Sequence, residues 1–225
     1  MARDFEAVSL DVGGVLVVPD HGLVAAALRR AGASFDRGRF AIGHYLAMAA
    51  VDRAASAPED FTDYADGFLA AVEVPEDQRE AAHAALADLL GTPVWNQPLP
   101  GARSGVAALT AAGVRLGVTS NSDGGLADHL RRHEWLQVGE GPGVEVAVIS
   151  DSGVLGVGKP DPVMFDATVA GLGVPVDRVL HVGDSVVYDV EGALACGLQA
   201  VHMDPFGLCA SADHRHVTAL AGLLD

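Results

Sequence analysis

Short apolar runs that each end in polar residues constrain the fold of this chain most strongly. Residues 7–11 form one such run, which ends in Asp11 and is followed by two glycines, and residues 114–118 and 179–182 form two more. Helical spacing of apolar residues precedes each later run, and residues 198–203 form a fourth run after another helical pattern. Strands that alternate with helices predict a parallel α/β sheet with its functional groups at the carboxyl ends of the strands.

The helical patterns carry start and stop signals. Asp161 before Pro162 is typical of an N-cap followed by a first helical residue. Gly113 would end the helix that precedes the run at residues 114–118. A further helix is predicted from about Asp189 to the residue before Gly197.

Residues 18–97 interrupt this rhythm. Their apolar positions follow helical spacing, and we recognise no strand among them. The pattern predicts four helices, at residues 22–31, 40–55, 61–72 and 76–90, with a turn at residues 56–60. We therefore predict a Rossmann-like catalytic core formed by residues 1–17 and 98–225, flanked by helices, and an all-helical inserted domain formed by residues 18–97.

Composition excludes several classes of protein. Of 225 residues, 50% are hydrophobic, and 14 basic against 30 acidic side chains give a net charge of −16. This charge repels polyanions, so we expect no nucleic-acid partner. The acidic start and the lack of a long apolar run indicate no signal peptide and no membrane span, so we expect a cytoplasmic protein. Monomer and homodimer both remain open.

Cysteine content gives a further constraint. Only Cys196 and Cys209 are present, which is too few for a disulfide framework, and their spacing is not that of a metal site. A reducing compartment fits this composition. We interpret Cys196 as a small residue that packs a helix.

Four segments together resemble the motifs of the haloacid dehalogenase superfamily of hydrolases, most of which are phosphatases with a Rossmann-like core. Residues 8–16, 118–121, 159–162 and 183–189 match the four motifs in order. The inserted helical domain resembles the C1 type of cap in this superfamily. The resemblance implies an α/β hydrolase of the phosphatase type that acts on a small phosphorylated substrate.

The resemblance also implies roles for individual residues. Asp11 would be the nucleophile that forms an aspartyl-phosphate. Lys159, the only lysine of the chain, would neutralise the nucleophile and the phosphoryl oxygens. Ser120 and Asn121 would bind a phosphoryl oxygen through the Ser120 hydroxyl and the backbone amides of their loop.

The implied cofactor is Mg²⁺. Its preference for hard oxygen ligands fits the Asp11 carboxylate, the Gly13 carbonyl and the Asp184 carboxylate. Asp189 would bind in the second shell or through water, and the alternative for this residue is a helix N-cap.

One position departs from the phosphatase pattern. The resemblance places a second aspartate two residues after the nucleophile, where it protonates the leaving group, and this chain has Gly13 there. Asp20 and His21 are the nearest substitutes in sequence, although a surface loop is the simpler interpretation of both. His181 is interpreted as a core histidine with a backbone partner.

Three functions therefore remain open. The leading hypothesis is a Mg²⁺-dependent phosphomonoesterase that uses Asp11. A 2-haloacid dehalogenase is the first alternative, because that branch also lacks the second aspartate. The second alternative is a catalytically weakened member that binds a phosphorylated ligand or a protein partner.

Overall fold

The computed structural model describes residues 4–54 and 61–225. The chain divides into two compact units. The first, which we call the sheet unit, consists of Met1–Leu16 and Pro100–Asp225. The second, the inserted unit, consists of Val17–Leu99.

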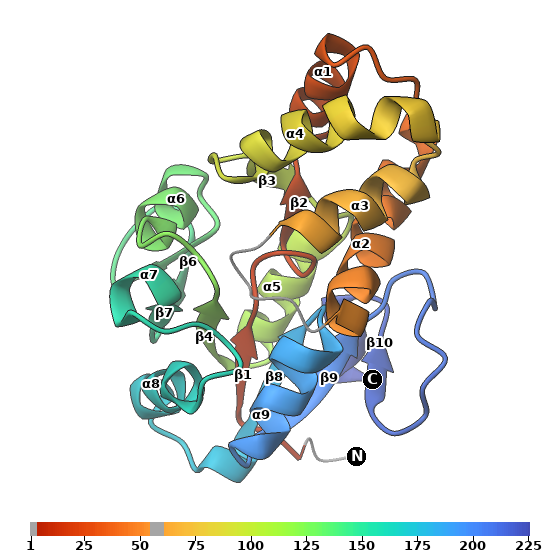
Figure 1. Ribbon diagram of the computed structural model, residues 1–225. Helices are drawn as coiled ribbons and strands as arrows, with labels where there is room; N and C mark the ends of the chain where they lie inside the picture. Colours follow the sequence, from red (N-terminus) through yellow and green to blue (C-terminus); the bar gives the residue numbers. More distant parts are fainter. Residues whose placement is uncertain (1–3, 55–60) are drawn as a thin grey trace. The chain divides into compact units, whose positions relative to one another are not determined.

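A six-stranded sheet in the order β10-β9-β8-β1-β4-β7 forms the centre of the sheet unit, and every neighbouring pair of strands is parallel (Figure 1). This confirms the predicted α/β class. The strands are β1 (Ala7–Leu10), β4 (Arg115–Ser120), β7 (Ile149–Asp151), β8 (Val179–Gly183), β9 (Gln199–Met203) and β10 (Arg215–Val217).

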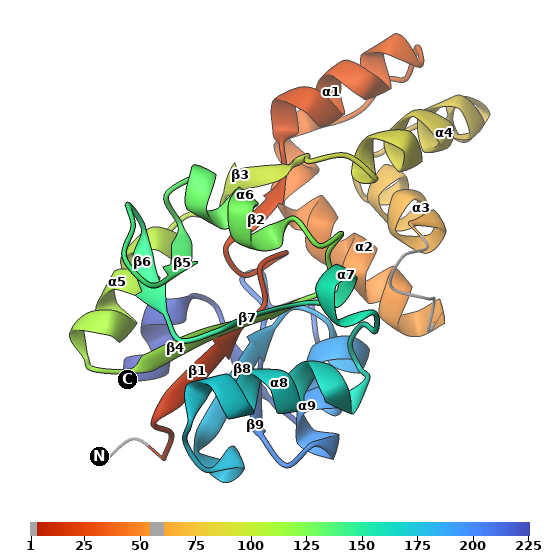
Figure 2. The ribbon, with the colours of Figure 1, turned by 90° about the vertical axis from the view of Figure 1, so that its left-hand side faces the viewer.

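Helices cover both faces of this sheet, with α8 and α9 on one side and α5 on the other (Figure 2). A short parallel pair, β5 (Leu136–Val138) with β6 (Val144–Val146), completes the strands of the unit. The helical segments are α5 (Ala102–Ala111), α6 (Leu126–Arg132), α7 (Ser152–Leu155), α8 (Pro162–Leu172), η3 (Val176–Arg178), η4 (Val186–Glu191), α9 (Gly192–Ala195) and η5 (Leu220–Leu224).

Helix ends follow the predicted signals in one case and differ in another. The Asp161 side chain accepts a hydrogen bond from the Val163 amide at the start of α8, as predicted for an N-cap. The helix predicted from about Asp189 begins earlier, because Ser185 caps it and a π-helical turn, Val186–Glu191, precedes α9. Asp189 therefore lies inside the helical segment and is not its N-cap.

One buried apolar cluster lies between the sheet and α8 and α9. Its buried members are Ala7, Phe165, Leu172, Val179, Val190, Ala193, Leu198 and Ala200. Complete burial of a large apolar side chain stabilises a fold by about 1.5–3 kcal/mol, so this cluster contributes to the stability of the unit. Cys196 packs against the same cluster, as predicted.

The predicted helices of the insertion are confirmed over the described residues. They are α1 (His21–Arg30), α2 (Phe40–Ala54), α3 (Thr62–Ala71) and α4 (Arg79–Leu90), with short turns η1 (Arg37–Arg39) and η2 (Glu76–Gln78). The turn predicted at residues 56–60 and the end of the second predicted helix lie outside the described residues.

The prediction of no strand in the insertion is wrong. Two short strands, β2 (Val17–Pro19) and β3 (Trp95–Pro98), pair antiparallel in the inserted unit. Three or four residues are too few to give a recognisable alternation, and both strands contain a proline.

Aromatic side chains form the interior of the inserted unit. Phe40 and Phe68 lie with ring centroids 5.4 Å apart, and His44 Nδ1 is 2.9 Å from the Tyr64 hydroxyl. The ring of Trp95 lies 5.9 Å from each of the rings of His44 and Tyr64. Trp95 therefore packs into this aromatic cluster.

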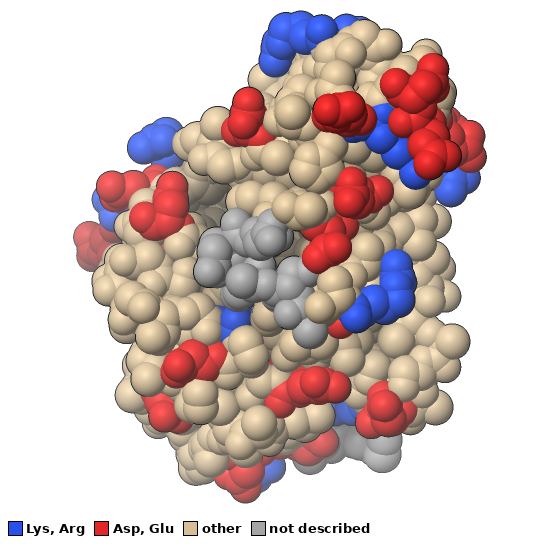
Figure 3. Space-filling model, viewed as in Figure 1, with Lys and Arg blue, Asp and Glu red and all other residues tan. Residues whose placement is uncertain are grey.

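Surface features agree with the composition. Acidic side chains are scattered over the face shown in Figure 3, so the negative charge is distributed. Among the described helices, none combines the length and the apolar character needed to cross a membrane.

Candidate active site

Three neighbouring strands of the sheet bring the predicted residues together. Asp11 follows β1, Ser120 ends β4, and Asp184 follows β8. Because β8, β1 and β4 are adjacent and parallel, their carboxyl ends lie at the same edge of the sheet. The amide of Asp11 donates to the Val182 carbonyl of β8 and so continues the pairing of the strands into the site.

The loop after β1 depends on a glycine. Gly14 has a positive φ of 62°, and a Cβ there would lie 2.0 Å from Asp184 Oδ2. Any larger residue would displace the Asp184 carboxylate. The close approach at Gly14 therefore brings the first and fourth motifs into contact.

Lys159 is the buried cation of the site. Its Nζ lies 3.1 Å from Asp11 Oδ1 and 2.5 Å from Asp189 Oδ1, and its side chain is 3% exposed. Burial alone would lower the pKa of Lys159, but the two carboxylates raise it above its ordinary value. The ammonium therefore stays charged between two anions.

Burial is also the largest influence on Asp11, and it raises the pKa of this carboxyl. Lys159 opposes this effect, and so do hydrogen bonds from the Ser120 hydroxyl and the Val12 amide. A further cation beside Asp11 would favour its charged, nucleophilic form.

Asp189 is held by several donors. Its Oδ1 lies 3.0 Å from His181 Nε2 as well as next to Lys159, and its Oδ2 accepts a hydrogen bond from the Ser185 amide. Burial raises the pKa of Asp189, but Lys159 and His181 together lower it well below its usual range. The carboxylate is thus ionised, and both of its oxygens already accept hydrogen bonds.

A chain of buried polar side chains lies beneath these carboxylates. His181 Nδ1 is 2.9 Å from the Ser9 hydroxyl, which lies 2.7 Å from the hydroxyl of Thr119, and Thr119 is 2.6 Å from that of Thr168. The prediction that His181 has a backbone partner is wrong, because both ring nitrogens bind side chains. A sequence pattern shows that a strand residue is buried, but not which side chains face it.

The side chain of Asn121 forms two hydrogen bonds with the backbone of Lys159. Its Oδ1 accepts a hydrogen bond from the Lys159 amide at 2.7 Å, and its Nδ2 donates to the Lys159 carbonyl at 3.3 Å. The side chain of Asn121 therefore positions the backbone of Lys159.

The three carboxylates of the site are suitable ligands for a hard cation. One oxygen from each of Asp11, Asp184 and Asp189 lies within 4.8 Å of the others, and all three residues are buried. Carboxylate oxygens are the ligands that Mg²⁺ prefers. Asp189 is the least available of the three, because its Oδ1 contacts both Lys159 and His181.

The proposed substitutes for the missing acid belong to the inserted unit. The Asp20 carboxylate caps α1 by accepting from the amides of Gly22 and Leu23. The ring of His21 packs edge-on against Phe40, and burial lowers its pKa. Asp20 therefore has a structural function in this unit.

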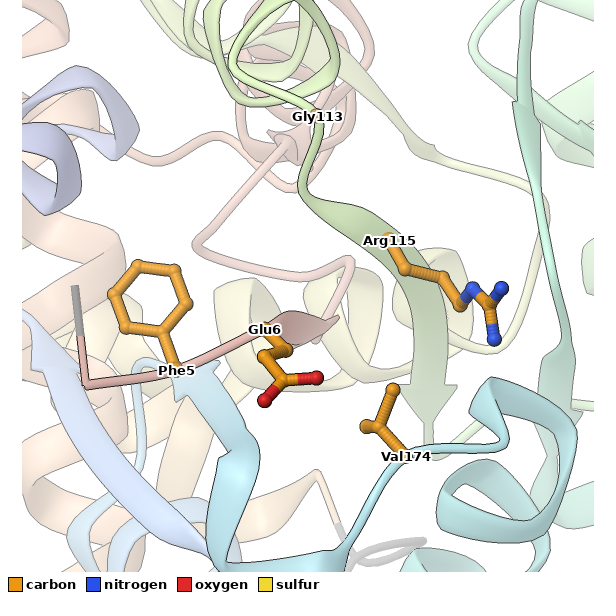
Figure 4. Close-up of a pocket in the computed structure, with 5 residues that line it drawn as sticks. All are labelled: Phe5, Glu6, Gly113, Arg115 and Val174. Carbon is orange, nitrogen blue, oxygen red and sulfur yellow. The ribbon is translucent and has the colours of Figure 1, made fainter. Parts of the chain in front are cut away.

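A cavity of about 460 Å³ lies at the amino ends of β1 and β4, away from the candidate site. It is lined by Phe5, Glu6, Gly113, Arg115 and Val174 (Figure 4). Its charged groups already have partners, because Arg115 donates to the Leu172 carbonyl and Glu6 lies 3.4 Å from Arg178.

Comparison with known families agrees with the motifs. A family model described as haloacid dehalogenase-like hydrolase matches residues 5–197. The chain belongs to this family. The resemblance of the four motifs is thereby confirmed, and the protein is a hydrolase of this type.

Two curated relatives of this hydrolase are phosphatases. It is 32% identical over 130 residues to the phosphoserine phosphatase of Thermus thermophilus, which covers 58% of this chain and 48% of that protein. It is 38% identical over 127 residues to the phosphoglycolate phosphatase of Rhodospirillum rubrum, which covers 56% of this chain and 47% of that protein. The matched stretch spans about half the length of these relatives.

A solved dehalogenase, crystallised as an intermediate complex, shares the fold with a TM-score of 0.62 at 16% identity, over 99% of this chain and 97% of that one. At this identity the similarity concerns the fold alone.

Proposed function

We propose that this hydrolase is a Mg²⁺-dependent phosphomonoesterase that acts on a small phosphorylated metabolite through an aspartyl-phosphate at Asp11. The observation that carries the proposal is the buried ammonium of Lys159 between Asp11 and Asp189, with the Asp184 carboxylate beside them. Such a site has a nucleophile, a fixed cation and oxygen ligands for a second cation.

In the proposed mechanism, Asp11 attacks phosphorus in line with the leaving group. The Ser120 hydroxyl and the backbone amides at Ser120 and Asn121 bind a phosphoryl oxygen, and Lys159 offsets the charge that builds on the others. When bound by Asp11, Asp184 and the Gly13 carbonyl, Mg²⁺ supplies Lewis-acid stabilisation of this charge. Water then hydrolyses the aspartyl-phosphate and regenerates Asp11.

Charge balance favours this reaction over dehalogenation. Three buried carboxylates converge within 4.8 Å, and the one lysine of the chain offsets a single charge. Two uncompensated anions at such distances are costly, and a divalent cation removes that cost. Carbon–halogen cleavage requires no such cation.

Gly13 determines which substrates react well. No carboxylate at this position can protonate a departing alkoxide, and a positioned general acid contributes about 10²- to 10⁴-fold. We therefore propose that the substrates are aryl or acyl phosphates or sugar 1-phosphates, whose leaving groups depend less on protonation by a general acid.

The inserted unit is proposed to act as a helical cap over the site. The chain enters this unit after Leu16, soon after Asp11, and leaves it at Leu99, before β4 leads to Ser120. Movement of the unit would thus act directly on both loops. Magnesium with beryllofluoride, a phosphoryl mimic, should slow hydrogen exchange in α1 to α4, and identical exchange with and without it would contradict closure.

The reaction is tested by measuring phosphate release from aryl phosphate, sugar phosphates and nucleotides, and halide release from 2-haloacids, each with Mg²⁺ or with a chelator. We expect phosphate release that requires Mg²⁺ and no halide release. Metal-independent halide release would establish the dehalogenase instead. Tight binding of a phosphorylated ligand without any turnover would establish the weakened binding protein.

A further inference from the structure

A second cluster of metal-ligating side chains lies at the edge of the same sheet. It consists of His202, Cys209, His214 and His216, and one donor atom from each lies within 4.8 Å of the others. His202 and His216 are partners in the parallel register of β9 and β10, so their side chains leave the same face of the sheet. Cys209 and His214 come from the loop that joins these strands.

The hydrogen bonds of two histidines fix their tautomers. His202 Nε2 donates to the Asp184 carbonyl at 3.1 Å, and His214 Nδ1 donates to the Asp213 carboxylate at 2.5 Å. The opposite nitrogens, His202 Nδ1 and His214 Nε2, then both carry lone pairs, and they face each other at 3.3 Å. Two acceptors at this distance repel each other unless a cation lies between them.

A proton is a poor occupant of this position. It would join one pair of nitrogens, whereas four donor atoms converge here. The side chain of His214 is 5% exposed, so bulk water has little access to its Nε2.

Two separations within this cluster match those of a tetrahedral transition-metal site. Zinc–nitrogen bonds of about 2.0–2.1 Å and zinc–sulfur bonds of about 2.3 Å imply nitrogen–nitrogen separations of roughly 3.3–3.4 Å and nitrogen–sulfur separations of roughly 3.6 Å. The structure has 3.3 Å between His202 Nδ1 and His214 Nε2, and 3.7 Å between Cys209 Sγ and His214 Nε2.

The surrounding loop supports the ligands. Both oxygens of the buried Asp204 accept backbone hydrogen bonds, from the amides of Leu208 and Cys209, each at 2.9 Å. These bonds fix the backbone at the cysteine. Asp213 orients His214, which is the arrangement of carboxylate, histidine and metal that is common around zinc.

We propose that His202, Cys209, His214 and His216 bind one Zn²⁺ ion in a closed, four-ligand structural site. The ion fastens the loop between β9 and β10, which Figure 1 shows at the C-terminal end of the chain, to the edge of the sheet. Through His202 it also holds the backbone carbonyl of Asp184. The spacing of the two cysteines did not indicate this cluster, because only one cysteine belongs to it and its other members are histidines.

Metal content of the full chain, purified without an affinity tag, tests the proposal. Inductively coupled plasma mass spectrometry after removal of free metal should find one zinc per chain. Cys209→Ser and His214→Ala should bind zinc about 100-fold more weakly or worse, because loss of a supporting residue alone costs about 10- to 100-fold. Cys196→Ser, the matched cysteine control, should retain one zinc.

Cobalt substitution gives a second readout that does not depend on activity. Co²⁺ in the wild type should show the intense visible bands of tetrahedral coordination and a thiolate-to-cobalt charge-transfer band that is lost in Cys209→Ser and kept in Cys196→Ser. Asp213→Ala, which changes an exposed side chain and should fold, should weaken zinc binding about tenfold. Wild-type chain that stays metal-free in equimolar zinc, or a six-coordinate cobalt spectrum, would overturn the proposal.

Discussion

Two clusters of metal-ligating side chains lie on either side of Asp184, and they differ in donor chemistry. The Asp184 carboxylate belongs to a buried oxygen cluster with Asp11 and Asp189, into which Lys159 already projects. The Asp184 carbonyl accepts a hydrogen bond from His202, a member of a cluster of three imidazoles and one thiol.

In our proposals, this difference in donor atoms makes the two clusters suit different metals. Hard carboxylate oxygens suit Mg²⁺, whereas imidazole and thiolate suit Zn²⁺. The oxygen cluster has three carboxylates against the single ammonium of Lys159. The nitrogen and sulfur cluster has four protein ligands and thus no open position for a substrate.

Loss of the nucleophile should have the largest effect and should separate the two clusters. Asp11→Asn should lower kcat/KM by about 10⁴-fold or more, because no other group can form the covalent intermediate. Zinc content should stay at one per chain. Steady-state kinetics and metal analysis of Asp11→Asn beside Asp177→Asn, an exposed control, check both points, and near-normal activity would contradict the role of Asp11.

Removal of the buried cation should damage both activity and stability. Lys159→Met leaves the carboxylates of Asp11 and Asp189 without their buried partner, which costs about 3–5 kcal/mol of unfolding free energy. Activity should fall by about 10²- to 10³-fold. Urea unfolding measures the first quantity.

Two further variants sharpen this result. Arg132→Met on α6 removes an exposed positive charge and should change stability by less than about 0.5 kcal/mol. Lys159→Met combined with Asp189→Asn should be more stable than Lys159→Met alone, since one uncompensated anion is gone. Equal stability of these two proteins would argue against charge as the cause.

Gly13→Asp should raise kcat/KM for substrates with poor leaving groups by about 10²-fold, because the new carboxyl group can protonate the departing oxygen. The wild type should show a steep fall in log(kcat/KM) as the leaving-group pKa rises, and the variant a shallower one. The positive φ of this loop is at Gly14, so an L-residue at position 13 does not meet that strain. A shallow slope in the wild type would show that another group already donates the proton.

The smallest effect on catalysis is expected from the nitrogen and sulfur cluster. Cys209→Ser should raise the Mg²⁺ concentration for half-maximal activity by a few-fold, because His202 holds the Asp184 carbonyl less firmly. Its Tm should fall by several degrees, since zinc binds the folded chain and stabilises it. If Mg²⁺ activation in Cys209→Ser equals that in Cys196→Ser, the two clusters are independent.

The sequence predicted the sheet and most helices because hydrophobic periodicity and caps such as Asp161 are local signals. It failed at β2, β3, β5, β6, β7 and β10, which are only three or four residues long. The start of the helix near Asp189 was also missed, because Ser185 and a π-helical turn precede it.

At the site, the motifs indicated the residues but not their contacts. The roles predicted for Asp11, Lys159 and Asp184 remain predictions, while the structure adds that Asn121 bonds the Lys159 backbone and that His181 supports Asp189. Such contacts join residues far apart in sequence. The four-ligand cluster was missed for the same reason, because the register of β10 with β9 brings His216 beside His202.

The stereochemical course at phosphorus tests the central claim most directly. A phosphorothioate ester made chiral at phosphorus with oxygen isotopes is hydrolysed in water of a third isotope, and the configuration of the product is determined. Each in-line displacement inverts phosphorus, so attack by Asp11 followed by attack of water predicts net retention. Net inversion would mean that water attacks the substrate directly, and it would contradict the aspartyl-phosphate at Asp11.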